Sequence, residues 1–163
     1  MFRKMRRWKQ QVSEERAWEM LREGRTGTLA LTGDNGYPYS VPVNYTVADG
    51  KVLFHGAKDG YKADLLRTHP NVSMSVILRD ELDGVRLTTI FASVILFGEA
   101  KELQGAEKLE AAALFARRYS DDQRAIDAEI EREKKMLAMW AIEVNHITGK
   151  EAIEIVRERE ENR

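Results

Sequence analysis

Residues 36–66, GYPYSVPVNYTVADGKVLFHGAKDGYKADLL, decide the fold. The stretch holds two runs rich in valine, tyrosine and phenylalanine, which predict strands over residues 39–47 and 51–55. Asp49-Gly50 between the runs predicts a tight turn. A short helix is expected next, over residues 59–69, and Pro70 ends it because the residue before a proline avoids helical geometry.

The pattern outside this stretch continues the same kind of fold. Ser13 can cap a helix over residues 13–24, and the spacing of apolar residues predicts a helical segment over residues 105–136. Further strands are expected at residues 28–32, 72–77, from a polar loop at 79–84 onward to about residue 103, and 139–147, before a charged tail at 151–163. Short strands joined by tight turns predict a mainly β fold with flanking helices (α+β), arranged as a barrel or sandwich in a single domain over residues 1–163.

The composition is that of a globular protein and excludes several kinds of chemistry. The chain has 163 residues, 43% hydrophobic and 33% charged, and a formal net charge of −1, which argues against nucleic acid or anionic membranes as partners. The absence of cysteine excludes thiolate catalysis and zinc–thiolate sites, and the three histidines have no metal-ligand spacing, so no metal site is expected. The basic first residues lead into no apolar stretch, so we expect a cytoplasmic protein.

Two prolines, Pro38 and Pro42, lie beside or within the run at residues 39–47. Proline has no N–H to donate to a sheet, so Pro42 predicts that this strand has no partner on one side at its midpoint. A plain edge strand would explain this. The functional alternative is that the gap receives a planar ligand, whose polar edge meets free backbone groups.

The segment HGAKDGYK, residues 55–62, passes from a strand end through two glycines into the first turn of a helix. Backbone N–H groups at a helix start, together with Lys62, would form an anion site suited to a phosphate monoester. A solvent-exposed loop with an incidental lysine would give the same pattern. The sequence pattern is compatible with His55 as a structural histidine and with His55 as a ligand contact. Ser93, in an apolar strand, needs a hydrogen-bond partner if it is buried, from a backbone carbonyl or from a ligand.

Several segments, in order, resemble one protein family. They are MRRW near the start, GYPYSVPVNY, LFHGAKDGYKADLLRTHPNVSMSV and ASVILFGEA. Over residues 5–150 the chain resembles the split-barrel flavoproteins related to pyridoxamine 5′-phosphate oxidase, and within them the branch of the nitroimidazole-resistance proteins. The resemblance implies a split β-barrel that binds FMN at the interface of a homodimer.

The resemblance also implies roles for the residues that the local patterns select. The flavin would lie along residues 41–44, His55 and Gly56 would lie near the ribityl phosphate, and Tyr61 and Lys62 would flank the phosphate, with Ser93 reaching the flavin from another strand. The implied cofactor contacts are Val41, Pro42, Val43, Asn44, His55, Gly56, Tyr61, Lys62 and Ser93.

Two departures from the family pattern bear on function. Related oxidases often have an arginine where this chain has Tyr61, which removes one charge-assisted contact with the phosphate. The Arg-x-His substrate motif of the oxidase is replaced by NHITGK at residues 145–150, which argues against oxidation of pyridoxamine phosphate.

The expected function is therefore that of an FMN-dependent oxidoreductase acting on a small molecule, with nitroaromatic compounds as one substrate class. His55 is the one acid–base side chain among the motif residues, and it carries the tentative catalytic assignment. The alternative is a noncatalytic module that binds a flavin, haem or a deazaflavin for sensing or storage. Apolar surface of Trp8, Trp18 or the helix over residues 109–119 could contribute to the contact of the expected homodimer, and burial of each within its own subunit is the alternative.

Overall fold

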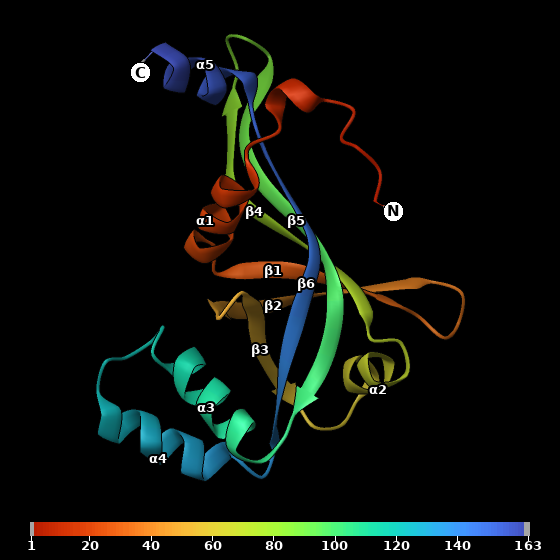
Figure 1. Cartoon of the computed structure of the whole chain (residues 1–163), viewed down its shortest axis with the longest axis vertical. Coiled ribbons are helices and arrows are strands. Elements are labelled where there is room, and N and C mark those ends of the chain that lie inside the picture. The colour runs from red at the N-terminus through yellow and green to blue at the C-terminus, as the bar shows by residue number, and fades with distance from the viewer. Residues whose placement is uncertain (1, 162–163) are drawn as a thin grey trace.

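The computed structural model describes residues 2–161 and shows a six-stranded antiparallel barrel with helices around it (Figure 1). The strands follow one another around the barrel in the order β1-β2-β3-β6-β5-β4, and β4 closes onto β1. The strands are β1 (Thr26–Thr32), β2 (Pro38–Ala48), β3 (Lys51–Ala57), β4 (Asn71–Asp83), β5 (Thr88–Leu103) and β6 (Leu137–Glu151). The helical elements are η1 (Trp8–Gln10), α1 (Glu14–Glu23), α2 (Tyr61–Thr68), α3 (Gly105–Ala116), α4 (Gln123–Glu133) and α5 (Ile153–Glu161).

The expected mainly β fold with flanking helices is confirmed, and a closed barrel replaces the sandwich alternative. One local prediction is wrong. The polar loop expected at residues 79–84 is the end of β4, which runs to Asp83 and pairs with the start of β5. This end of the hairpin is exposed on both faces, so its sequence shows little of the apolar alternation that marks a half-buried strand. The tail at 151–163 contributes α5, over Ile153–Glu161.

The barrel is filled by side chains that alternate along each strand. In β4, Val72, Met74 and Val76 are buried in the core, while Ser73, Ser75 and Ile77 between them point outward. A smaller apolar cluster lies outside the barrel, where Ala112 and Phe115 of α3 pack on the outer face of β3 and β6. The molecule thus has one core inside the barrel and a second beneath α3.

The helices cover different parts of this barrel (Figure 1). Helix α1 packs on β6, α2 lies at the end of the barrel near β1 and β5, and α3 and α4 form a helical hairpin on the β3 side. Helix α1 starts at the predicted cap, where the backbone N–H of Arg16 donates to Oγ of Ser13. No helix among residues 2–161 is long and apolar enough to cross a membrane.

Candidate functional site

The sheet opens between β2 and β3. Residues 38–44 of β2 pair with β1, whereas residues 45–48 pair with β3. In the same way, residues 55–57 of β3 pair with β6 and have no partner in β2. We call the opening between residues 38–44 and residues 55–57 the split. Pro42 lies in it, opposite Thr28 of β1 and without a partner toward β3, as the sequence predicts.

Lys62 of α2 reaches the split beside Gly56. Its Nζ lies 2.8 Å from the position that a Cβ atom on Gly56 would take, and 5.9 Å from the centre of the Phe54 ring. The side chain is half-buried, and burial lowers the pKa of Lys62. No carboxylate among residues 2–161 pairs with this ammonium group. The glycine thus leaves room for a half-buried cation that has no counter-ion within the described chain.

The start of α2 provides backbone N–H donors in addition to the Lys62 ammonium group. Gly60, the residue before the helix, has φ of 116°, a conformation that side-chain-bearing residues rarely adopt. No side chain caps this end, so the first N–H groups of α2 have no side-chain acceptor. Free N–H groups at a helix start together with a lysine form an anion site.

The side chain of Tyr61 is engaged with the β1–β2 hairpin. Its hydroxyl donates to Oδ1 of Asp34 in the β1–β2 turn at 2.8 Å, and its ring meets Tyr39 edge-on at 5.0 Å. The hydrogen bond to Asp34 raises the pKa of Tyr61. The Tyr61 side chain therefore links α2 to the β1–β2 hairpin, and the group of Tyr61 that an anion could contact is the backbone N–H.

Helix α3 and the residues after it cross the other side of the split. The His55 ring meets Phe115 edge-on at 4.7 Å, and Phe115 lies 5.7 Å from the ring of Tyr119. The side-chain amide of Asn44 donates to the Tyr119 hydroxyl at 3.4 Å, so two ring contacts and one hydrogen bond join β3 to β2. Burial, and secondarily the charge of Lys62, lower the pKa of His55, which favours a neutral imidazole.

The remaining predicted residues divide into two groups. Val41 and Val43 pack into the barrel core, so they present backbone to the split. Ser93 is half-buried on the far half of β5, opposite Lys150 of β6. Leu103 of β5 and His55 of β3 both pair with Met139 of β6, so Leu103 marks the level of His55 in the sheet. At about 3.3 Å per residue, Ser93 lies roughly 30 Å along β5 from Leu103. One chain therefore does not bring Ser93 close to His55.

Sequence reasoning did not select Phe115 or Tyr119 as site residues. Their spacing of four places both rings on one side of a helical turn, which is a recognisable signal, but it does not say what the rings contact. The contact with His55 depends on how the α3–α4 hairpin folds back on β3. That arrangement is not encoded in a local pattern.

Known structures share this architecture at low sequence identity. A candidate 5-nitroimidazole antibiotic resistance protein from Bacteroides thetaiotaomicron is 21% identical, with a TM-score of 0.70, covering 86% of this chain and 85% of that chain. An FAD-binding protein from Mesorhizobium loti is 22% identical, with a TM-score of 0.61 and coverage of 87% and 96%. An FAD- and haem-binding protein from Mycobacterium smegmatis is 19% identical, with a TM-score of 0.66 and coverage of 88% and 73%. These similarities show the fold.

The sequence comparison assigns the family. No curated protein matches the sequence significantly. The sequence profile of the pyridoxamine 5′-phosphate oxidase family, however, matches residues 13–151, most of the chain and all six strands of the barrel. The chain therefore belongs to the pyridoxamine 5′-phosphate oxidase family, as its resemblance to that family implies.

Proposed function

We propose that this protein binds FMN in the split, with the phosphate at Lys62 and the flavin ring along β2. One observation supports the proposal most strongly: the Lys62 ammonium is half-buried, has no counter-ion among residues 2–161, and lies where Gly56 has no side chain. A buried charge without a partner is costly in a folded protein, so its retention indicates a ligand that supplies the opposite charge.

The groups around Lys62 fit a phosphate monoester. A dianion would receive one charge-assisted contact from the ammonium and further contacts from the N–H groups at the start of α2. Residues 41–44 have backbone groups without a strand partner on the side of the split. Asn44 adds a side-chain amide, which is positioned by its hydrogen bond to the Tyr119 hydroxyl. These are the polar groups that the edge of a flavin ring requires.

FMN, when bound, supplies electron and hydride transfer, and the protein supplies binding, orientation and electrostatics. We propose an oxidoreductase acting on a small molecule, with nitroaromatic compounds as one substrate class. The similarity to the Bacteroides protein, whose description names resistance to 5-nitroimidazole antibiotics, supports that class. His55 is the titratable side chain at the border of the site, and a neutral imidazole there offers one hydrogen-bond donor and one acceptor.

We further propose that two copies share the site. The outer face of β4 and β5 exposes Ile77, Ile95 and Phe97. Ile95 pairs with Ser75, Ser75 with Thr28, and Thr28 with Pro42, so this face and the split lie on one continuous row across four strands. An apolar sheet face of this kind is typical of subunit interfaces. A second copy that packs on this face would also reach the split. In such a dimer, Ser93 of one copy could approach a flavin in the split of the other copy.

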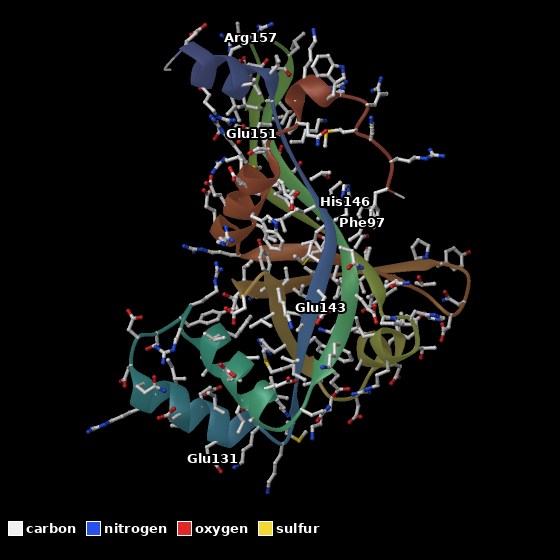
Figure 2. The ribbon with its side chains drawn as sticks, in the orientation of Figure 1. Phe97, Glu131, Glu143, His146, Glu151 and Arg157 are labelled. Carbon is white, nitrogen blue, oxygen red and sulfur yellow. The ribbon has the colours of Figure 1, made fainter. Side chains whose placement is uncertain are left out.

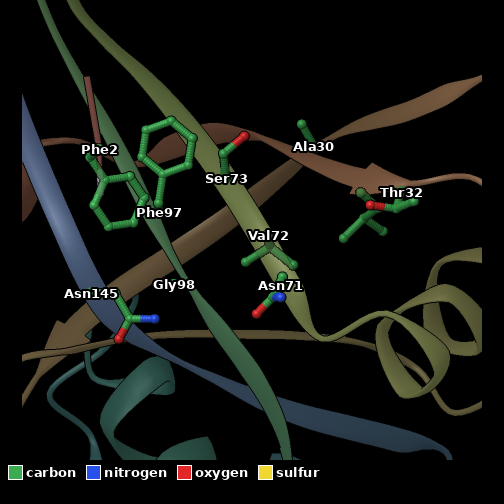
Figure 3. Close-up of a pocket in the computed structure, with 10 residues that line it drawn as sticks. Phe2, Ala30, Thr32, Asn71, Val72, Ser73, Phe97, Gly98 and Asn145 are labelled. Carbon is green, nitrogen blue, oxygen red and sulfur yellow. The ribbon is translucent and has the colours of Figure 1, made fainter.

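The same outer face is hollowed next to Phe97. A pocket of about 470 Å³ is lined by Phe2, Ser73, Phe97 and Asn145, among others (Figure 3). Phe2 stacks on His146 at 4.5 Å, and the labels of Figure 2 place His146 and Phe97 side by side on β6 and β5. His146 stands in the segment that replaces the oxidase motif, and here it packs with aromatic residues on the proposed interface.

The cofactor is identified by a visible spectrum and a titration. We expect flavin absorption bands in the purified protein, or quenching of FMN fluorescence at one FMN per chain at micromolar concentration. A Soret band would instead favour the haem-binding alternative, and the absence of quenching would remove the flavin proposal. Bleaching of the bound flavin by NADH or NADPH then tests the oxidoreductase assignment.

Analytical ultracentrifugation over a dilution series tests the shared site. We expect a dimer whose dissociation is accompanied by flavin release, measured as flavin absorbance sedimenting with protein. A monomer with its full complement of FMN would show that one chain is sufficient.

A further inference from the structure

A second cavity adjoins the split on the side of α3. It lies between α3 and α4, over the end of β3 and the start of β6, and has a volume of about 420 Å³. That volume is within the range of small-molecule sites. Most of its lining is apolar and includes Ala112, Ile126, Ile130 and Met139. We call it the α3–α4 pocket.

Aromatic groups line the end of the pocket nearest the split. His55, Phe115 and Tyr119 all belong to the lining, and their rings meet edge-on or tilted rather than stacked face to face. A flat ring can pack against such a wall by offset or edge-on contacts, which are the favoured aromatic geometries. No hydrogen bond within residues 2–161 occupies the ring nitrogens of His55, so they are available to a ligand.

The charges around the pocket disfavour an anion. Two carboxylates, Glu129 and Glu133, contribute to the lining, and no lysine or arginine does. Arg132 pairs with both carboxylates on the exposed side of α4, so these three side chains leave a net charge of −1. An anionic ligand would lose hydration on entering and meet this net negative charge, and the lining itself contains no lysine or arginine to pair with it.

We propose that the α3–α4 pocket binds a small uncharged aromatic molecule, with its ring against Phe115 and a polar substituent hydrogen-bonded to His55. The two neighbouring sites then differ in charge preference: the site at Lys62 takes an anion, and the α3–α4 pocket takes a neutral ring. His55 belongs to the border between them. The proposal concerns binding alone, and it stands whether or not the split binds a flavin.

A matched pair of probes tests the charge preference. Isothermal titration calorimetry of the full-length protein with 4-chlorobenzamide and 4-chlorobenzoate compares two molecules of nearly the same shape, one neutral and one anionic. We expect the amide to bind at least about tenfold more tightly than the carboxylate. Equal affinities, or no binding of the amide up to millimolar concentration, would overturn the proposal.

Variants that fill the pocket test its location. Ala116→Phe places a ring among the lining residues and should weaken 4-chlorobenzamide at least about tenfold. Ala113→Phe makes the same change on the same helix outside the lining, and should leave the affinity unchanged. Ala125→Phe repeats the test from the exposed start of α4, where folding is least at risk.

Wild-type affinity in both pocket variants, or an equal loss in Ala113→Phe, would show that the probe binds elsewhere. FMN titration of the same proteins separates this proposal from the flavin proposal. Loss of probe binding with normal FMN binding supports the α3–α4 pocket as a separate site.

Discussion

The two sides of the barrel are built differently. On one side β5 pairs with β4 from Thr88 to Glu99 and with β6 from Ala92 to Leu103, so its whole length is paired and its middle half has partners on both edges. On the other side β2 changes partner at Tyr45, and the strands separate. The continuous side provides stability through hydrogen bonds and packing. The open side leaves backbone groups, a cation and a helix start available to a ligand.

Two glycines show the same difference at atomic scale. A Cβ atom on Gly98 would lie 2.3 Å from the backbone oxygen of Glu143 in β6. A Cβ atom on Gly56 would lie 2.8 Å from Nζ of Lys62, the end of a flexible side chain. The first glycine is needed for the contact between two strands. The second is needed for the position of a cation.

The largest effect is expected at Gly98. Gly98→Ala forces β5 and β6 apart because backbone atoms cannot rotate out of the way, and it should destabilise the protein by about 2–3 kcal/mol. Urea denaturation measures this change. Gly84→Ala is the matched control, since a Cβ there meets no atom within 4 Å. Equal stability of the two variants would contradict the comparison.

Gly56→Ala should affect binding more than folding. The added methyl group displaces the Lys62 ammonium, which can rotate away, so FMN affinity should fall about tenfold while stability falls by less than about 1 kcal/mol. Fluorescence titration and urea denaturation of the same preparation give both numbers. A large loss of stability with unchanged FMN affinity would assign Gly56 to the fold.

Removing the charge of Lys62 should stabilise the ligand-free protein. Burial lowers the pKa of Lys62 from its ordinary 10.5, so the folded state binds this proton less tightly than the unfolded state. The stability of the wild type should therefore rise as pH increases through the folded pKa toward 10.5. Lys62→Met should melt at a higher temperature than the wild type at pH 7, with the difference shrinking at pH 10. A lower melting temperature at pH 7 would contradict the account.

The smallest effect is expected from His55. Its pKa is lowered mainly by burial, so the stability that depends on the neutral imidazole is complete above pH 6.5 and is lost as pH falls toward the folded pKa. His55→Gln should make the melting temperature less sensitive to pH below 6.5. Melting temperatures of the wild type and of His55→Gln, measured at pH 5.5 and 7.5, test this. The same pH sensitivity in the two proteins would place His55 in a water-like environment.

Local patterns in the sequence predict much of the fold and part of the site. Turn residues and alternating side chains identify the strands, and Pro42 identifies the interrupted pairing because proline has no N–H to donate to a neighbouring strand. The segment around Gly56 and Lys62 indicates an anion site from the sequence, but an exposed loop with an incidental lysine has the same pattern, and only the structure places Lys62 beside Gly56.

Contacts between distant segments could not be predicted. Periodicity places Leu109, Ala112 and Tyr119 on one apolar face, but only Ala112 of these is buried, whereas Leu109 is 44% and Tyr119 is 67% exposed. Helical periodicity gives the shape of a face but not which neighbour covers it. The same limit applies to Tyr61, whose partner Asp34 lies in a hairpin 27 residues away.

The central claim is that the split binds a phosphate through Lys62. The most direct test compares FMN with riboflavin, which lacks only the phosphate, in the wild type and in Lys62→Met. A charge-assisted contact contributes about 1.5–3 kcal/mol, so the variant should bind FMN roughly 10- to 100-fold more weakly and riboflavin as the wild type does. An equal loss for both ligands, or for neither, would contradict the assignment of Lys62 to the phosphate.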